Sequence, residues 1–202
     1  MIPAIVLAAG KSTRMGRPKA NLPIDGETFL SRIVRTFYDA AVPDVVVVVG
    51  HDAEAVVAAF SETGAAARFI MNPDYESGQL SSLIRGLNAV DRPGVAAALV
   101  TLVDVPLVAA STVRAVVDRY RRTHAPIVRP VRGGAHGHPV LIDRSLFDEI
   151  RRADPTAGAK RVVRAHSSPA GDVDVDDEGA FGDIDTVAEY ERVVGPDAGR
   201  NL

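Results

Sequence analysis

The residues best suited to chemistry stand in the loop that follows the first apolar run. Residues 7–19 read Leu-Ala-Ala-Gly-Lys-Ser-Thr-Arg-Met-Gly-Arg-Pro-Lys. Small side chains here let backbone N–H groups approach an anion closely. Arg14 adds a bidentate fork of N–H donors, and Lys19 adds a mobile positive charge. The loop therefore predicts a polyphosphate-binding site formed by Ala8, Ala9, Gly10, Ser12, Gly16, Arg14 and Lys19.

Two common phosphate-binding motifs do not describe this loop. A Walker A motif needs a glycine five residues before Gly10, where this chain has Ile5. The dinucleotide-binding fingerprint needs a glycine where Ser12 stands. The loop must therefore hold phosphate through a different arrangement of its backbone.

Polar residues also follow two later apolar runs. The segment 72–82 comes after the run that ends at Met71, and Asp104 comes directly after the run that ends at Leu102. Because ligands bind at the carboxyl ends of parallel strands, these residues are expected to meet the first loop at one sheet edge. Asp104 has a second interpretation, as the N-cap of the following helix.

The elements that position these residues alternate between strand and helix. The predicted strands lack polar alternation, which is typical of strands covered on both faces. They lie at 5–7, 45–49, 68–71 and 96–102. Apolar residues at helical spacing predict helices around 29–37, 53–60 (with Asp52 as N-cap), 80–87 and 111–122. This alternation predicts an α/β fold with three layers and a mostly parallel sheet.

The second half is less regular, but it continues the pattern. Strands are predicted at 127–131, 139–142 and 171–175, with a Gly-rich turn at 133–137, and helices at 144–152, 159–165 and 186–194. Thr186 or Asp185 is expected to cap the last helix. The acidic stretch 172–178 is interpreted as solvated. We expect one domain over residues 1–194 and a mobile tail over 195–202.

Composition excludes several classes of protein. The 202 residues include no cysteine, so disulfides, thiolate metal sites and a cysteine nucleophile are absent. A net charge of −3 argues against a nucleic-acid or anionic-membrane partner. No apolar run reaches the roughly 18 residues of a membrane span. With no basic segment before the first run, we expect no signal peptide and a cytoplasmic protein.

Five segments in order carry a family resemblance. The first loop resembles the opening signature of the MobA-like nucleotidyltransferases, particularly the molybdenum cofactor cytidylyltransferases. The other four resemble that family's Asn-Pro-to-Ser segment, its Asp-x-Pro motif, its Gly-His-Pro loop and its Asp-Ile-Asp-Thr box. In this chain they stand at 72–82, 104–106, 137–139 and 183–186, so the matches span nearly the whole sequence.

The resemblance implies a Rossmann-like nucleotide-diphospho-sugar-transferase fold and a nucleotidyl transfer. An acceptor phosphate would attack the α-phosphate of an NTP, releasing pyrophosphate, with positioning and charge neutralisation carrying the rate. Arg14, Lys19 and Asp104 would be the catalytic residues. Mg²⁺ would be the cofactor, on Asp104 with Asp185 as second carboxylate; Asp185 retains the N-cap alternative. Nucleotide-binding residues would be Leu7, Ala8, Ala9, Gly10, Ser12, Arg14, Lys19, Asn72, Gly78 and Ser82.

The resemblance also implies the partners. Gly137, His138, Pro139 and Lys160 would bind a molybdopterin-type acceptor, and a molybdenum hydroxylase would receive the product. Two residues depart from the family pattern: Val105 replaces the common Gln and Gln79 replaces a Met. Both border the expected acceptor site. Ala9 stands where the guanylyl-transferring branch has Gly, which favours CTP over GTP.

Several alternatives stay open. The chain is interpreted alternatively as a nucleotidyltransferase for another phosphorylated small molecule, as an NAD(P)H-dependent reductase like nicotine blue oxidoreductase, or as a non-catalytic carrier of molybdenum cofactor. A zinc or nickel site at His136 and His138 is disfavoured, since no third ligand stands nearby in the sequence. The basic residues around Lys160 are mostly interpreted as a solvated face.

Overall fold

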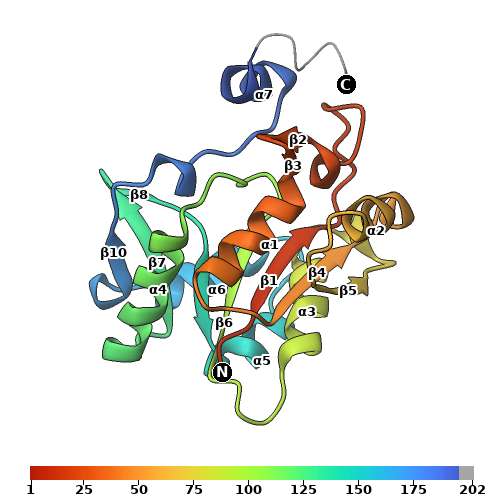
Figure 1. Ribbon diagram of the computed structural model, residues 1–202. Helices are drawn as coiled ribbons and strands as arrows, with labels where there is room; N and C mark the ends of the chain where they lie inside the picture. The colour runs from red at the N-terminus through yellow and green to blue at the C-terminus, as the bar shows by residue number, and fades with distance from the viewer. Residues whose placement is uncertain (196–202) are drawn as a thin grey trace.

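A mixed, mostly parallel sheet forms the centre of the protein. The computed structural model describes residues 1–195. Its eight-stranded sheet has the order β10-β7-β9-β6-β1-β4-β5, with β8 paired to β7 (Figure 1). The strands are β1 (Ala4–Ala8), β4 (Val45–Val49), β5 (Arg68–Met71), β6 (Ala97–Leu102), β7 (Ile127–Arg132), β8 (Ala135–His136), β9 (Val140–Asp143) and β10 (Asp172–Asp174). Strands β6, β1, β4 and β5 are parallel, whereas β9 is antiparallel to both β6 and β7.

Alternate residues of the central strands feed two cores, one on each face of the sheet. Val6 of β1 belongs to the core under helices α1, α2 and α4, and Ile5 belongs to the core under α3, α5 and α6. The helices are α1 (Phe29–Asp39), α2 (Ala53–Ser61), α3 (Gln79–Val90), α4 (Ala110–Thr123), α5 (Phe147–Arg151) and α6 (Ala159–His166). Burial on both faces explains why these strands are continuously apolar. The predicted three-layer α/β fold is therefore confirmed.

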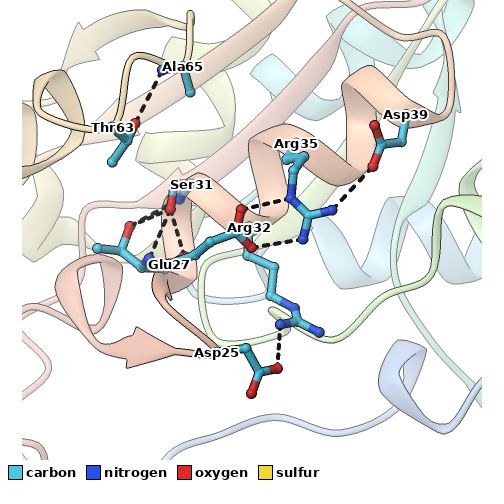
Figure 2. A network of polar contacts seen from close by, with 9 residues as sticks. Asp25, Glu27, Ser31, Arg32, Arg35, Asp39, Thr63 and Ala65 are labelled. Atoms are coloured by element: carbon cyan, nitrogen blue, oxygen red, sulfur yellow. Dashed lines mark hydrogen bonds and ion pairs between the residues drawn. The ribbon is translucent and has the colours of Figure 1, made fainter.

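A small hairpin that the sequence analysis did not predict leads into α1. It consists of β2 (Pro23–Ile24) and β3 (Glu27–Thr28). Thr28 then caps α1 in a reciprocal capping box with Ser31. Figure 2 shows Arg35 of α1 reaching back to Glu27, with N–O distances of 2.7 and 2.8 Å, while Arg32 contacts Asp25. These contacts fix the hairpin on the first turns of the helix.

The last helix, α7 (Val187–Val194), packs on this hairpin. Tyr190 is fully buried and donates its hydroxyl to the Pro23 carbonyl at 2.6 Å. Thr186 caps α7 in a capping box with Glu189, so Asp185 is not the cap. The last helix therefore leaves the Asp185 carboxylate available for other contacts.

Some boundaries differ from the predictions. Asp52 stands at the N-cap position of α2 in a left-handed conformation, and its side chain makes no capping hydrogen bond. The helix predicted over 144–152 is a 3₁₀ turn followed by the short α5. No helix within residues 1–195 is long and apolar enough to span a bilayer. Of the predicted tail, positions 196–202 lie outside the described residues.

Candidate active site

A cavity of about 280 Å³ opens at the carboxyl ends of β1 and β6. The first loop, the start of α3 and the segment after β6 all contribute to its wall. Ten of the residues singled out in the sequence line it: Leu7, Ala9, Gly10, Ser12, Arg14, Lys19, Gly78, Ser82, Asp104 and Asp185. We call this space the nucleotide cavity.

Three residues that the sequence also assigned to the site, Ala8, Gly16 and Asn72, are not among the lining residues. The Ala8 side chain packs in the core. Asn72 is completely buried and donates hydrogen bonds to the hydroxyls of Ser81 and Ser82, both at 2.9 Å. Asn72 therefore orients the start of α3, whose residue Ser82 lines the cavity.

Lys19 occupies the centre of the charged part of the cavity. Its Nζ lies 3.2 Å from Asp104 Oδ2 and 2.5 Å from Asp185 Oδ1. The Lys19 side chain is only 10% exposed, and those of Asp104 and Asp185 are 21% and 39% exposed. One positive charge thus holds two carboxylates together at the carboxyl ends of the strands. The hydrogen bond from Lys19 lowers the pKa of Asp185, against the opposing effect of partial burial.

The first loop folds back so that its cations face the cavity. The Lys19 backbone N–H donates to the Ser12 hydroxyl at 3.1 Å, and the Met15 N–H donates to the Ser12 carbonyl. The Met15 side chain is buried against the hairpin and α7. Arg14 remains 69% exposed, with its nearest carboxylate, Asp185, at 3.8 Å. Arg14 is therefore free to turn toward an incoming anion.

The second carboxylate comes from a segment that we call the strap, residues 177–185. Its Asp177 carboxylate accepts hydrogen bonds from the Ala109 N–H at 2.9 Å and the Thr112 hydroxyl at 2.6 Å, which ties it to the start of α4. At the other end, the Ile184 N–H donates to the Asp104 carbonyl at 2.8 Å. The backbone of the strap is thus bound to Asp104, whose carboxylate shares the Lys19 ammonium group with the carboxylate of Asp185. Asp177, interpreted as solvated from the sequence, is a structural anchor.

Two glycines let the strap lie this close. A Cβ on Gly179 would stand 2.1 Å from the Leu107 carbonyl oxygen. A Cβ on Gly137 would stand 2.4 Å from the Ala180 carbonyl oxygen, which also accepts a hydrogen bond from the His138 N–H at 2.8 Å. The Gly-His-Pro loop therefore packs directly on the strap.

Asp183 belongs to the 183–186 segment, which resembles a family motif but suggested no role for this residue, and it does not line the nucleotide cavity. Partial burial, and then the negative charge of Asp104, raise the pKa of Asp183. Within the described residues, Asp183 does not join Asp104 and Asp185 as a third metal-binding side chain.

The carboxylates fit a hard divalent cation. Asp104 Oδ1 is buried and has no hydrogen-bond partner, although its other oxygen contacts Lys19. An orphaned carboxylate oxygen is costly without a ligand, and oxygen donors suit Mg²⁺ or Mn²⁺. Within the part of the chain that the structure describes, no three His, Asp or Glu side chains converge as a complete metal site. A cation here would complete its shell with phosphate and water oxygens.

The residues expected to bind an acceptor lie beside this cavity. A second space of about 670 Å³, which we call the acceptor pocket, is lined by Gly137, His138 and Lys160 and shares Leu7, Gln79 and Leu102 with the nucleotide cavity. Pro139 is buried and faces a separate small hollow instead. Gln79, one of the two departures from the family pattern, thus stands at the junction.

His138 lines the acceptor pocket. Its Nδ1 is buried without a partner. Burial lowers the pKa of His138, opposed by a hydrogen bond to the Val100 backbone and by the charges of Asp183 and Asp104. The imidazole is therefore biased toward its neutral form. His51, by contrast, is half-exposed and stacks at an angle on Tyr75.

Comparison with known proteins identifies relatives over nearly the whole chain. Residues 4–170 match the model of a family described as the MobA-like NTP transferase domain. Nicotine blue oxidoreductase of Paenarthrobacter nicotinovorans is 30% identical over 201 residues, which are 96% of each protein. A probable molybdenum cofactor guanylyltransferase of Mycolicibacterium paratuberculosis is 32% identical over 80% of this chain and 78% of its own length. The strap lies outside the matched family segment.

Solved structures agree with the fold. The crystal structure of Rv0371c from Mycobacterium tuberculosis superposes with a TM-score of 0.81 at 28% identity, covering 96% of this chain and 98% of that one. A second structure of Rv0371c is a complex with manganese, with a TM-score of 0.75 at 28% identity, covering 96% and 97%. These matches confirm the predicted family resemblance and indicate that divalent metal binding occurs among its relatives.

Proposed function

Because the chain belongs to the MobA-like NTP transferase family and is a nucleotidyltransferase, we propose that it transfers CMP from CTP to the phosphate of molybdopterin or molybdenum cofactor. Pyrophosphate leaves, and Mg²⁺ is the cofactor. One observation carries the proposal: Lys19 pairs with both Asp104 and Asp185 at the mouth of a cavity walled by the first loop. The arrangement supports this proposal because carboxylates suit the cation, while the small residues of the loop let its backbone approach the phosphates.

The residues divide the work of the transfer. Asp104 and Asp185 would hold the cation, which neutralises charge on the triphosphate when it is bound. Lys19, released from the carboxylates, neutralises negative charge on the triphosphate. Arg14 turns from its exposed position to offset the charge that develops on the leaving pyrophosphate. Their task is to position and neutralise, because nucleotidyl transfer asks little covalent chemistry of the protein.

The choice of nucleotide and acceptor is supported by two features. Ala9 lines the nucleotide cavity at the position where the guanylyl-transferring branch has Gly. The acceptor pocket opens beside it, lined by Gly137 and His138 of the loop that resembles the family's Gly-His-Pro motif. We further propose a molybdenum hydroxylase as the recipient of the product.

The relative named as an oxidoreductase motivates a second candidate. Nicotine blue oxidoreductase matches 96% of this chain, so a hydride transfer on the same fold is the competing hypothesis. It would require a nicotinamide site, whereas the charged groups of the nucleotide cavity are two carboxylates and two cations.

Product analysis by mass spectrometry tests these proposals together. The purified protein is incubated with Mg²⁺, molybdenum cofactor and either CTP or GTP, and pyrophosphate release is followed in parallel. We expect a cytidylylated pterin with matching pyrophosphate. A guanylylated product would overturn the choice of base. Tight binding of Mg-CTP without any product would overturn the proposed identity of the acceptor. Oxidation of NADPH without binding of CTP or GTP would instead favour the reductase hypothesis.

A further inference from the structure

An ion pair spans the rim of the nucleotide cavity. The Nζ of Lys11, in the first loop, lies 2.5 Å from Oε1 of Glu76, in the 3₁₀ turn just before α3. The two side chains are 49% and 65% exposed, so the contact is open to water. Neither residue lines the cavity, but their chain neighbours Gly10, Ser12 and Tyr75 do. The pair therefore joins two walls of the cavity from outside, and we call it the latch.

The latch is the polar contact that sets the spacing of these two walls. Ser12 is held from within its own loop, since its carbonyl and hydroxyl oxygens accept hydrogen bonds from the Met15 and Lys19 N–H groups. In the described part of the chain, the latch alone among hydrogen bonds and ion pairs joins residues 10–14 to the segment 72–82. Breaking it would leave the outer part of the first loop without a polar tie to that segment.

The inner side of the same walls is joined by packing. A Cβ on Gly50, at the end of β4, would lie 2.7 Å from the Cβ of Tyr75 and 2.9 Å from the Cβ of Ala9. Glycine at this position therefore lets the two lining side chains approach each other. The His51 N–H also donates to the Ala9 carbonyl at 3.2 Å. The base of the Tyr75 turn is thus fixed, and its rim depends on a solvent-exposed ion pair.

We infer that Lys11 and Glu76 are positioning residues, whose ion pair keeps the first loop closed over the nucleotide cavity and must part when a nucleotide enters or leaves. This inference rests on the proposed nucleotide binding and adds the control of its rate. Because the ion pair forms in the free and in the bound protein alike, it opposes opening in both and slows entry and release by the same factor. A contact that does not differ between two states leaves the affinity unchanged.

The competing role for Lys11 is direct contact with phosphate, as a mobile cation of the polyphosphate loop. The two roles differ in what Glu76→Gln does. A phosphate-binding Lys11 would be freed by this change, so CTP would bind more tightly, whereas Lys11→Met would weaken binding. The latch predicts instead that both variants keep the parental affinity and gain speed in both directions. The absence of Lys11 from the lining residues favours the latch.

Stopped-flow binding of a ribose-labelled fluorescent CTP in Mg²⁺ measures both rates on the full chain. Lys11→Met and Glu76→Gln should each raise the association and dissociation rates about twofold to fivefold, the range of an exposed ion pair. The charge swap Lys11→Glu/Glu76→Lys should restore the parental rates. The matched control is Asp74→Asn, which removes an equally exposed ion pair to Arg85 of α3 (3.0 Å) that does not reach the first loop. Its rates should stay parental.

Hydrogen exchange of the ligand-free protein tests the latch without any nucleotide. The amides of residues 10–14 should exchange faster in both single variants and at the parental rate in Asp74→Asn. Unchanged exchange or unchanged binding rates in both single variants, tighter CTP binding by Glu76→Gln, or a charge swap that restores nothing would overturn the inference. Failure of the parent protein to bind Mg-CTP would overturn the proposed function instead, and the exchange rates would still decide the latch. Thermal melts confirm that each variant is folded.

Discussion

The nucleotide cavity and the acceptor pocket share three residues but treat charge in opposite ways. In the first, Lys19 is already paired with two carboxylates before any ligand arrives. In the second, Lys160 and Arg164 have no carboxylate among the residues that line the pocket. The first arrangement suits a ligand that brings both a cation and phosphates, because the ligand can exchange partners with Lys19. The second suits a bare anion. Local charge balance thus distinguishes two halves of one site.

The largest effect should come from removing the Asp104 carboxylate. Asp104→Asn keeps the size of the side chain but removes the charge that faces Lys19, so turnover should fall about a thousandfold or more. Steady-state pyrophosphate release measures this, with a thermal melt to confirm a cooperative fold. Turnover within a few-fold of the parent protein would contradict the metal assignment. Acceptor affinity should hardly change if the two halves are separable.

Lys19→Met should separate the two roles of this lysine. Without the ammonium group, CTP affinity should weaken by about tenfold to a hundredfold, and CMP affinity by much less. Mn²⁺ alone should bind more tightly, because Asp104 and Asp185 lose their resident positive charge. Calorimetry gives the nucleotide affinities, and electron paramagnetic resonance counts free Mn²⁺. Equal losses of affinity for CTP and CMP would show that Lys19 does not contact the β- and γ-phosphates.

Gly179→Ala should test the strap. The new Cβ would collide with the Leu107 carbonyl, so the chain must shift near Asp177 and destabilise the fold by about 1–3 kcal/mol. Mn²⁺ affinity should fall because the strap carries Asp185. The matched control is Gly182→Ala in the same strap, where the nearest atom to a Cβ lies 3.8 Å away. If both variants bind Mn²⁺ equally well, the strap does not position the carboxylate.

The smallest effect should come from Ala9→Gly. Loss of one methyl group from the wall of the nucleotide cavity should shift the ratio of kcat/KM for CTP over GTP toward GTP by roughly threefold to tenfold. Competition between the two nucleotides in one reaction measures this ratio directly. An unchanged ratio would place base selection on another residue. Acceptor KM should stay constant, which again checks that the halves are independent.

The strands that hold the site were predictable because burial on both faces leaves a simple signature. β1 and β4 are continuously apolar, and every residue in them is buried. The β2–β3 hairpin was not predictable in the same way, since each strand has only two residues and no period to detect. Asp52 illustrates a related limit: its residue type favours capping, but its left-handed backbone leaves the side chain without a capping hydrogen bond.

For the site, residue types indicated which groups would gather but not how they would pair. The small residues, cations and Asp104 of the nucleotide cavity were predictable because they come directly after strands whose carboxyl ends share one sheet edge. The sequence could not show that Lys19 would bridge Asp104 and Asp185. Asp104 lies 85 residues after Lys19 in the chain, and Asp185 lies 166 residues after it. Nor could it separate the anchor Asp177 from the other acids of the 172–178 stretch. Tertiary packing of the strap makes that distinction.

The strap also determines when, during synthesis, the site becomes complete. The polyphosphate loop, the central strands and Asp104 all leave the ribosome well before residues 177–185, which supply the last carboxylate and its anchors. A domain generally folds as a unit, and the first loop is itself packed on α7 through Met15, so the site cannot be complete until α7 has been made. A copy truncated before the strap would therefore lack both Asp185, the partner of Lys19, and the helix on which the first loop packs.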